Sequence, residues 1–207
     1  MVFLKVIGLC GGSGSGKGTV ASLLSELGIP TVDTDLVYRE LTSSPSDCLR
    51  ELCDEFGDGV INSDGVLDRA FLRAHVFEGD GAEQRRLRLN EITHFHILAE
   101  TRRRLALFST EGFIAATVDA PLLYESGFDR ECDAVIAVLA DRATRIARIT
   151  ERDGITPEAA AHRVDTQIAD GELIQRADFI IVNDGDRESL KTQVLAVAEK
   201  IQNLCEV

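Results

Sequence analysis

The stretch FLKVIGLCGGSGSGKGTV, residues 3–20, decides the fold class, because it passes from a strand-type sequence through a glycine cluster into a helix-type sequence. Residues 3–9 are mostly β-branched or bulky apolar, which is typical of a buried strand. Beyond Lys17, apolar residues recur at helical spacing, and Gly28 supplies a C-terminal stop. The apolar positions are Val20, Leu23, Leu24 and Leu27. The stretch therefore predicts a strand, a loop and a helix in direct succession.

The glycine cluster fits the pattern G-x4-G-K at the place where a phosphate-binding loop must lie. Glycines let backbone N–H groups turn towards the β- and γ-phosphates of a nucleotide, while the helix N-terminus adds partial positive charge. Lys17 adds a full positive charge. The predicted ATP site consists of Gly11, Gly12, Ser13, Gly14, Ser15, Gly16, Lys17, Gly18 and Thr19.

The end of this loop departs from the usual pattern. Gly18 stands where Ser or Thr normally binds Mg²⁺, and Thr19 follows it. The sequence G-K-G-T resembles nucleoside monophosphate kinases, in which phosphate oxygens and water chiefly hold the metal. A dinucleotide-binding loop is the weaker interpretation, because its G-x-G-x-x-A pattern would begin only at Gly16 and leave the earlier glycines unused.

Four further segments read as strands: residues 29–34, 113–118, 134–139 and 179–182. The first completes a β-α-β unit and thus implies a parallel sheet. Helical patterns occupy the interval from 36 to 108: one before Gly57, one capped by Asp68, and a longer one over about residues 83–108. The predicted fold is a doubly wound α/β sheet with a helical subdomain.

Three acids follow predicted strands at the edge where ligands bind in such folds. Asp33 and Asp35 end the second strand, and as alternate residues of an extended segment they are expected to point the same way. Alternatively, they cap the helical segment 36–41. Asp119 ends the third strand and resembles the acid that contacts metal-bound water in P-loop enzymes. Phosphoryl transfer to a hydroxyl needs an acid to accept or orient the acceptor proton.

Arg145, Arg148 and Arg152 are spaced three and four residues apart, which places them on one helix face. The functional interpretation is a lid that closes over a triphosphate, and the alternative is a solvated helix face. The arginine runs 85–86 and 102–104 are expected on solvated faces. The histidines have no metal-ligand spacing.

Composition excludes several classes of protein. With 207 residues and 44% hydrophobic content, the chain is predicted to form one folding unit. Its charge of -13 disfavours nucleic acid and anionic membranes as partners, and its apolar runs fall short of the roughly 20 residues of a membrane span. The N-terminus reads as a core strand and not as a signal peptide. The five cysteines form no C-x-x-C pair, which indicates a reducing, cytoplasmic location.

Motifs beyond the loop follow one another in a fixed order. They include GIPTVDTD at 28–35, NEITH at 90–94, DAPLLYESG at 119–127 and NDG at 183–185. Shorter matches are FG at 56–57, LDR at 67–69, LR at 72–73, VF at 76–77, RDG at 152–154, Arg163, Gln167 and AD at 177–178. Over nearly the whole chain, these motifs resemble the dephospho-CoA kinase family.

The resemblance implies a P-loop NTPase-type fold that phosphorylates the ribose 3'-hydroxyl of dephospho-CoA with ATP and Mg²⁺. The core would comprise residues 1–35, 110–140 and 177–207, with a helical acceptor-binding insertion at 36–109 and a helical lid at 141–176. A monomer or a weak homo-oligomer is expected.

The resemblance also implies roles for individual residues. Catalytic residues would be Lys17, Asp35, Arg148 and Arg152. Asn183 and Gly185 would border the adenine of ATP. The acceptor would contact Asp33, Arg69, Arg73, His94, Pro121, Leu122, Leu123 and Glu125. Thr19, Asp33 and Asp119 would hold Mg²⁺ through water.

Some positions depart from the family pattern: Phe95 replaces proline, Gly18 replaces Ser or Thr, and Arg145 stands where glutamine is frequent. Ser13 and residues 171–173 also differ. Two rival functions stay open: a cytidylate-type nucleoside monophosphate kinase, suggested by the loop, and a non-catalytic nucleotide-binding module. The acid pair and the arginine lid argue against the second rival.

Overall fold

The structure is a computed structural model that describes residues 4–205, and the chain divides into two compact units. Unit 1 holds the described residues up to Asp33 and from Leu105 onwards, and unit 2 is Thr34–Arg104. The predicted first strand began at Phe3, which lies outside the described residues.

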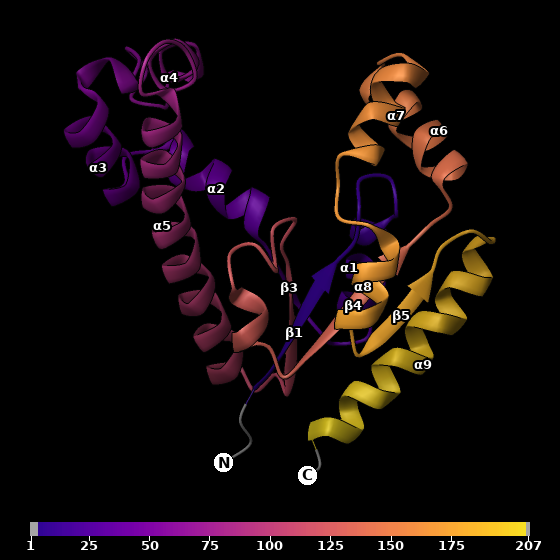
Figure 1. Ribbon diagram of the computed structural model, residues 1–207. Helices are drawn as coiled ribbons and strands as arrows, with labels where there is room; N and C mark the ends of the chain where they lie inside the picture. The colour runs from indigo at the N-terminus through magenta and orange to yellow at the C-terminus, as the bar shows by residue number, and fades with distance from the viewer. Residues whose placement is uncertain (1–3, 206–207) are drawn as a thin grey trace. The chain divides into compact units, whose positions relative to one another are not determined.

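Unit 1 is built on a five-stranded sheet in which the order is β2-β3-β1-β4-β5 and every pairing is parallel (Figure 1). The strands are β1 (Lys5–Cys10), β2 (Thr31–Asp33), β3 (Ala115–Asp119), β4 (Ala134–Leu139) and β5 (Phe179–Val182). The parallel α/β prediction is confirmed. Because β2 and β3 lie on one side of β1, and β4 and β5 on the other, strand order reverses at the carboxyl end of β1, where such folds bind ligands.

Helices α1 (Lys17–Glu26) and α9 (Arg187–Cys205) share a buried core with the sheet. Alternate strand residues point to opposite faces, so Ile7 and Leu9 of β1 pack towards these helices. Val20 and Leu24 of α1 are completely buried in the same cluster, as the helical spacing predicted.

The other face of the sheet is packed tightly at Gly8. A Cβ there would lie 2.8 Å from Leu123 Cδ2, so glycine leaves the space that this leucine fills. Leu123 belongs to the turn that precedes the short helix η2 (Phe128–Glu131), and α8 (Asp170–Arg176) packs against β4. The segment after β3 is therefore anchored to the central strand.

Two further helices of unit 1, α6 (Arg142–Asp153) and α7 (Pro157–Asp165), pack against each other around a small core that includes Ile149 and Ala160. Asp141 and Thr156 cap their N-termini by accepting hydrogen bonds from Thr144 and Ala159 backbone N–H groups.

Unit 2 is helical. Its elements are α2 (Thr34–Ser43), α3 (Asp47–Phe56), η1 (Asp58–Val60), α4 (Arg69–Val76) and α5 (Ala82–Thr110), the last of which runs on into unit 1. Cys48, Leu49, Leu52, Val60 and Ile92 are among the buried residues of its separate core. The predicted helices before Gly57, after Asp68 and over about 83–108 are all present, with Asp68 capping α4.

One local prediction is wrong. The strand expected over residues 29–34 ends at Asp33, and α2 begins at Thr34, so Asp35 lies in the first turn of a helix. Asp33 and Asp35 are therefore not alternate residues of one extended segment. The strand stops because β2 pairs with β3 only from Thr31 to Asp33.

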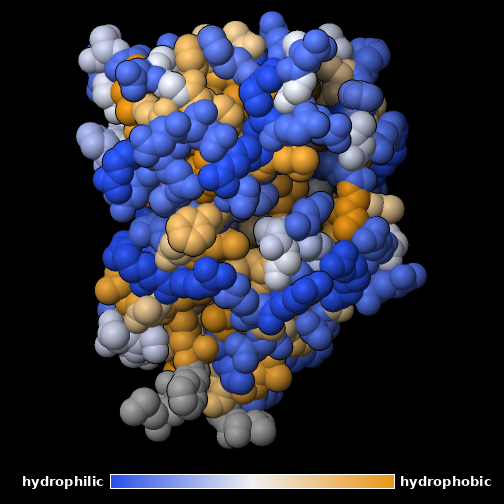
Figure 2. Space-filling view, turned by 60° about the vertical axis from the view of Figure 1, so that its left-hand side comes forward, coloured by the Kyte–Doolittle hydropathy of each residue, from blue (hydrophilic) through white to orange (hydrophobic). Residues whose placement is uncertain are grey.

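The visible face of the space-filling view is mostly hydrophilic, with hydrophobic residues in smaller areas between (Figure 2). Within residues 4–205, no helix combines the length and the apolar character that crossing a membrane requires. Within residues 4–205 no disulfide joins any of the five cysteines, and Cys10 and Cys48 are buried.

Candidate functional site

The glycine loop joins β1 to α1 through a backbone path that other residues adopt with strain. Gly11, Gly14 and Gly16 have φ values of 148°, 79° and 95°. The loop is also closely packed: a Cβ on Gly11 would lie 2.3 Å from the carbonyl oxygen of Val138 in β4. Glycine is thus needed both for conformation and for space.

Lys17, the first residue of α1, reaches back across the loop. Its Nζ lies 3.2 Å from the Gly11 carbonyl oxygen, to which it donates a hydrogen bond, and 3.8 Å from Asp119 Oδ1. The amino group is therefore held between the first residue of the loop and the end of β3.

Side chains from distant segments bind the carbonyl oxygens of the loop. Arg145 Nε donates to Ser13 O at 3.0 Å, and Arg148 Nη1 donates to Gly14 O at 3.1 Å. Asn183 Nδ2 donates to Ser15 O at 2.8 Å. Arg148 also donates to the carbonyl oxygen of Asn183 at 3.0 Å, so α6 and the loop after β5 are tied to the same part of the phosphate loop.

Arg145 is a buried residue with only 4% exposure, which sequence reasoning did not foresee. Its guanidinium donates to Gln167 Oε1 at 2.7 Å and pairs with Asp170 at 3.3 Å. The sequence did contain an indication: Arg145 precedes the buried Ile149 by one helical turn, so it falls on the apolar stripe of α6. Gln167, known beforehand only as a motif match, is the second residue whose place in the site was missed.

Arg152 lies further along α6 and is engaged elsewhere. Its Nε donates to Asp153 Oδ1 at 2.7 Å, and its side chain is 59% exposed. Arg163 also donates to Asp153, and these contacts, Arg152 first, lower the pKa of that carboxyl to about 2. Arg145, Arg148 and Arg152 thus form a series from buried through half-buried to exposed, and only Arg145 and Arg148 bind the loop.

The carboxylates Asp33 and Asp119 are register partners on adjacent strands, at the same edge as the loop. Mg²⁺ keeps several waters and takes one or two carboxylates together with substrate phosphates, so these residues fit that ion. The described residues contain no cluster of three or more His, Cys, Asp or Glu side chains that could form an all-protein metal cage. Thr19, exposed in the first turn of α1, offers a hydroxyl one residue beyond the usual position.

The segment after β3 presents a mixed set of side chains. Pro121, Leu122 and Glu125 are exposed, whereas Leu123 is completely buried and offers no side-chain surface to a ligand. Tyr124 lies between Leu123 and Glu125 in the sequence. The Arg176 guanidinium stacks on its ring, 3.7 Å from the ring centroid.

Tyr124 also faces the last residue of β1. Its hydroxyl lies 4.0 Å from Cys10 Sγ, and burial raises the pKa of both groups. Both groups are therefore neutral at neutral pH and add no negative charge beside the phosphate loop.

Unit 2 carries the other predicted acceptor residues. Arg69 and Arg73 are exposed and one turn apart on α4, and Arg69 also lies 5.9 Å from the centroid of the Tyr38 ring. His94 is half-buried on α5. Asp35 belongs to the same unit, on the first turn of α2.

The loop after β5 begins with a buried residue and is tied to neighbouring segments. Asn183 is buried at 7% exposure, and its backbone N–H donates to Leu139 O. Asp184 Oδ1 accepts the N–H of Asp141, which links this loop to the start of α6. Gly185 precedes α9 and would place a Cβ 3.4 Å from Ser189.

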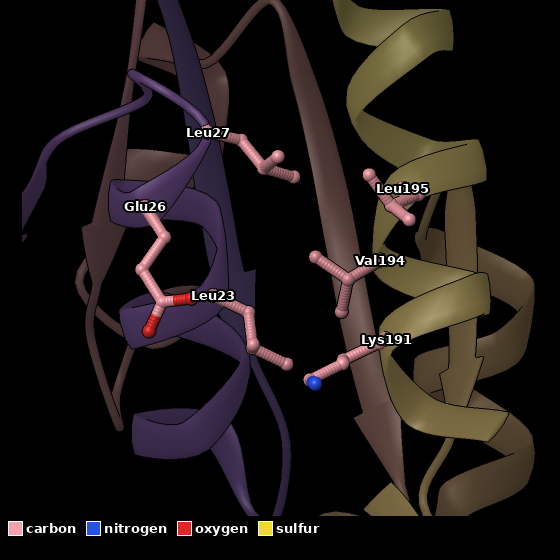
Figure 3. A pocket seen from close by; sticks show the side chains of 6 residues that line it. All are labelled: Leu23, Glu26, Leu27, Lys191, Val194 and Leu195. Carbon is pink, nitrogen blue, oxygen red and sulfur yellow. The ribbon is translucent and has the colours of Figure 1, made fainter. Parts of the chain in front are cut away.

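A separate surface pocket lies between the last turn of α1 and the middle of α9 (Figure 3). Leu23, Leu27, Val194 and Leu195 supply its apolar lining, and Glu26 and Lys191 its charged side chains. Because the phosphate loop precedes the first turn of α1, this pocket is at the opposite end of that helix and is not part of the site.

The sequence profile described as Dephospho-CoA kinase matches residues 5–189 of the chain. Two curated relatives carry the same name. The protein from Corynebacterium glutamicum is 38% identical over 94% of this chain and 96% of its own length. The one from Bacillus thuringiensis is 36% identical over the same shares of the two chains.

Solved structures share the fold. A protein of Thermus thermophilus superposes with a TM-score of 0.78 at 28% identity, over 95% of this chain and 97% of that one. Dephospho-CoA kinase from Campylobacter jejuni gives 0.68 at 23% identity, over 97% of both chains. Shikimate kinase from Bacteroides thetaiotaomicron gives 0.54 at 16% identity, over 96% of this chain and 98% of that one.

The packing of the loop makes a prediction about Gly16. Its φ of 95° disfavours any side chain, and a Cβ would lie 2.1 Å from Asn183 Nδ2. We expect Gly16→Ala to weaken ATP binding at least about tenfold, or about 1.4 kcal/mol, measured by calorimetry. Gly171→Ala is the matched control, since α8 offers open space around Gly171. Equal ATP affinity in the two variants would refute the packing argument.

Proposed function

The chain belongs to the dephospho-CoA kinase family, from which we infer that it phosphorylates dephospho-CoA with ATP in CoA biosynthesis. The observation that carries this conclusion is the family profile match over residues 5–189, which spans both structural units. The phosphate loop between β1 and α1 supplies the chemistry that the reaction requires.

We propose that the acceptor atom is the 3'-hydroxyl oxygen of the ribose. Its attack on the γ-phosphorus forms a P–O bond, the bond to the β–γ bridging oxygen breaks, and ADP leaves. Transfer of this kind relies on positioning and on neutralising charge more than on covalent chemistry. Lys17, held at the mouth of the loop, would stabilise the charge that develops on the phosphoryl oxygens.

We propose that Mg²⁺ binds together with ATP. When bound, it neutralises charge on the phosphate oxygens. Asp33 and Asp119 would hold it, because they lie side by side at the loop edge of the sheet. Gly18 offers no hydroxyl, so water and phosphate oxygens would complete the shell, with Thr19 as a further contact through water.

Unit 2 would supply much of the acceptor site, as the helical insertion over residues 36–109. Arg69 and Arg73 are exposed cations suited to the phosphates of dephospho-CoA, and His94 is a further proposed acceptor contact. From unit 1, the exposed residues Pro121, Leu122 and Glu125 would border the acceptor.

The region 141–176 is the proposed lid. Arg148 would act on the triphosphate from its place against the loop, with its side chain half-buried. Arg152 would have to exchange Asp153 for a phosphate, and its exposed position leaves room for that change.

Asp35 is the proposed base that accepts or orients the proton of the ribose hydroxyl. It lies in the first turn of α2, directly after the strand that ends with Asp33.

The partners and the location of the protein are proposed from its composition. A net charge of -13 disfavours nucleic acid and anionic membrane as partners, and the free cysteines suit the cytoplasm. A monomer or a weak homo-oligomer is proposed.

The acceptor can be identified with purified protein, ATP and Mg²⁺. ADP release should be followed with dephospho-CoA, CMP and adenosine in parallel, and dephospho-CoA should give by far the highest kcat/KM. CMP is the informative comparison, because the G-K-G-T end of the loop resembles cytidylate-type kinases. Faster turnover of CMP would replace the proposed acceptor.

The role of Asp35 can be separated from binding. A positioned acid-base group contributes about 10² to 10⁴ in rate, so Asp35→Asn should lower kcat at least about a hundredfold and change the Kd of ATP only a few-fold. Raising Mg²⁺ should not restore the rate. Asp33→Asn is the matched control, because a residue that organises metal-bound water should be partly relieved by more Mg²⁺.

Near-normal kcat in Asp35→Asn, or recovery with Mg²⁺, would remove the base assignment. In that case Asp35 would only stabilise the first turn of α2. The variant would then have a lower melting temperature and an unchanged kcat.

A further inference from the structure

Three consecutive carbonyl oxygens of the phosphate loop each accept a hydrogen bond from a different side chain. Arg145 binds Ser13 O, Arg148 binds Gly14 O, and Asn183 binds Ser15 O. We call these three side chains the carbonyl brace. They come from α6 and from the loop after β5, so the brace holds the phosphate loop from outside.

Peptide geometry connects these carbonyls with phosphate binding. A trans peptide is planar, so the C=O of one residue and the N–H of the next point in opposite directions. Donors that hold the carbonyls of Ser13 and Ser15 outwards must therefore turn the N–H groups of Gly14 and Gly16 inwards, where a phosphate would lie.

We propose that Arg145 and Asn183 are positioning residues for ATP: they hold the carbonyls of Ser13 and Ser15 and thereby aim the loop amides at the phosphates. This inference rests on the proposed function, in which the loop binds ATP. In this proposal Asn183 positions the loop, whereas the sequence led us to expect a contact with adenine. Arg145 also positions the loop, a role that the lid interpretation does not include.

Gln167 completes the arrangement at Ser13. Its Oε1 accepts the Ser13 N–H at 2.9 Å and an Arg145 N–H at 2.7 Å, while Arg145 Nε holds the Ser13 carbonyl. The backbone N–H and C=O of Ser13 are therefore both held, by Gln167 and Arg145, which are hydrogen-bonded to each other. An Arg145 guanidinium with three acceptors is also well satisfied for a buried charge.

The loop has glycines at the positions that these donor groups approach. A Cβ on Gly12 would lie 1.9 Å from Arg145 Nη2, and a Cβ on Gly16 would lie 2.1 Å from Asn183 Nδ2. Two glycines thus provide the space that the two brace residues occupy. Because each donor group occupies the space beside a glycine, we infer that the loop and these two side chains are fitted to each other.

The experiment uses two ligands, ATP and inorganic tripolyphosphate, because the second has the phosphates without the base. Arg145→Met and Asn183→Leu replace the donors by apolar side chains. A hydrogen bond from a charged group is stronger than one between neutral groups, so we expect Kd to rise at least about tenfold for Arg145→Met. Each variant should lose the same factor for both ligands, while the Kd of dephospho-CoA stays within about twofold.

Arg145→Gln tests geometry against charge. The Nε2 of glutamine and the Nε of arginine are both bonded to Cδ, so glutamine can donate to Ser13 O from the same place without the positive charge. We expect this variant to keep ATP and tripolyphosphate affinity within about threefold of wild type, less than half a decade in binding. Arg142→Met is the control on the same helix, since Arg142 is exposed and pairs with Asp165.

Each outcome decides a separate point. If Asn183→Leu weakens ATP but not tripolyphosphate, Asn183 contacts the base and the inference fails. If Arg145→Gln and Arg145→Met lose affinity equally, charge and not positioning explains Arg145. Should Arg145→Met not fold, Asn183→Leu and the exposed Gln167→Met decide instead, and normal tripolyphosphate affinity in both overturns the brace. Wild-type protein that binds neither ligand would instead refute the proposed function.

Discussion

The site depends on one constraint, the path of the backbone between β1 and α1. Gly11, Gly14 and Gly16 take up φ values that side chains disfavour, and the neighbouring β4 strand leaves no room for a Cβ at the first of them. The loop ends at the N-terminus of α1, where unpaired N–H groups and the helix dipole favour an anion. The remainder of unit 1 supports this path: the sheet fixes its start, and α6 and the loop after β5 fix its middle.

Charge is organised on a local scale within an acidic protein. The net charge is -13, yet two arginines of α6 and Lys17 all donate to carbonyl oxygens of the loop. These contacts turn the negative ends of the peptide dipoles away and leave cationic groups close by. Asp33 and Asp119 are register partners at the ends of β2 and β3, and Lys17 Nζ lies 3.8 Å from Asp119 Oδ1, so opposite charges meet at the edge of the sheet where the loop lies.

Local patterns predicted most of the fold, because strand periodicity, helix caps and the glycine loop are properties of short segments. The strands over 134–139 and 179–182 and the cap at Asp68 are as expected. The end of β2 was misjudged because it is set by pairing with β3, which no local pattern records.

The interior of the site was harder to foresee. A long polar side chain such as Arg145 reads as a solvated face until Gly12 is seen to leave space for it, and Asn183 and Ser15 are 168 residues apart. The most direct test of the whole account is Lys17→Met, with melting temperature and ATP turnover measured together. The account predicts an unchanged fold and a kcat below about a tenth of wild type, a loss of more than about 1.4 kcal/mol in transition-state stabilisation. A folded variant that keeps more than about a tenth of wild-type kcat would contradict it.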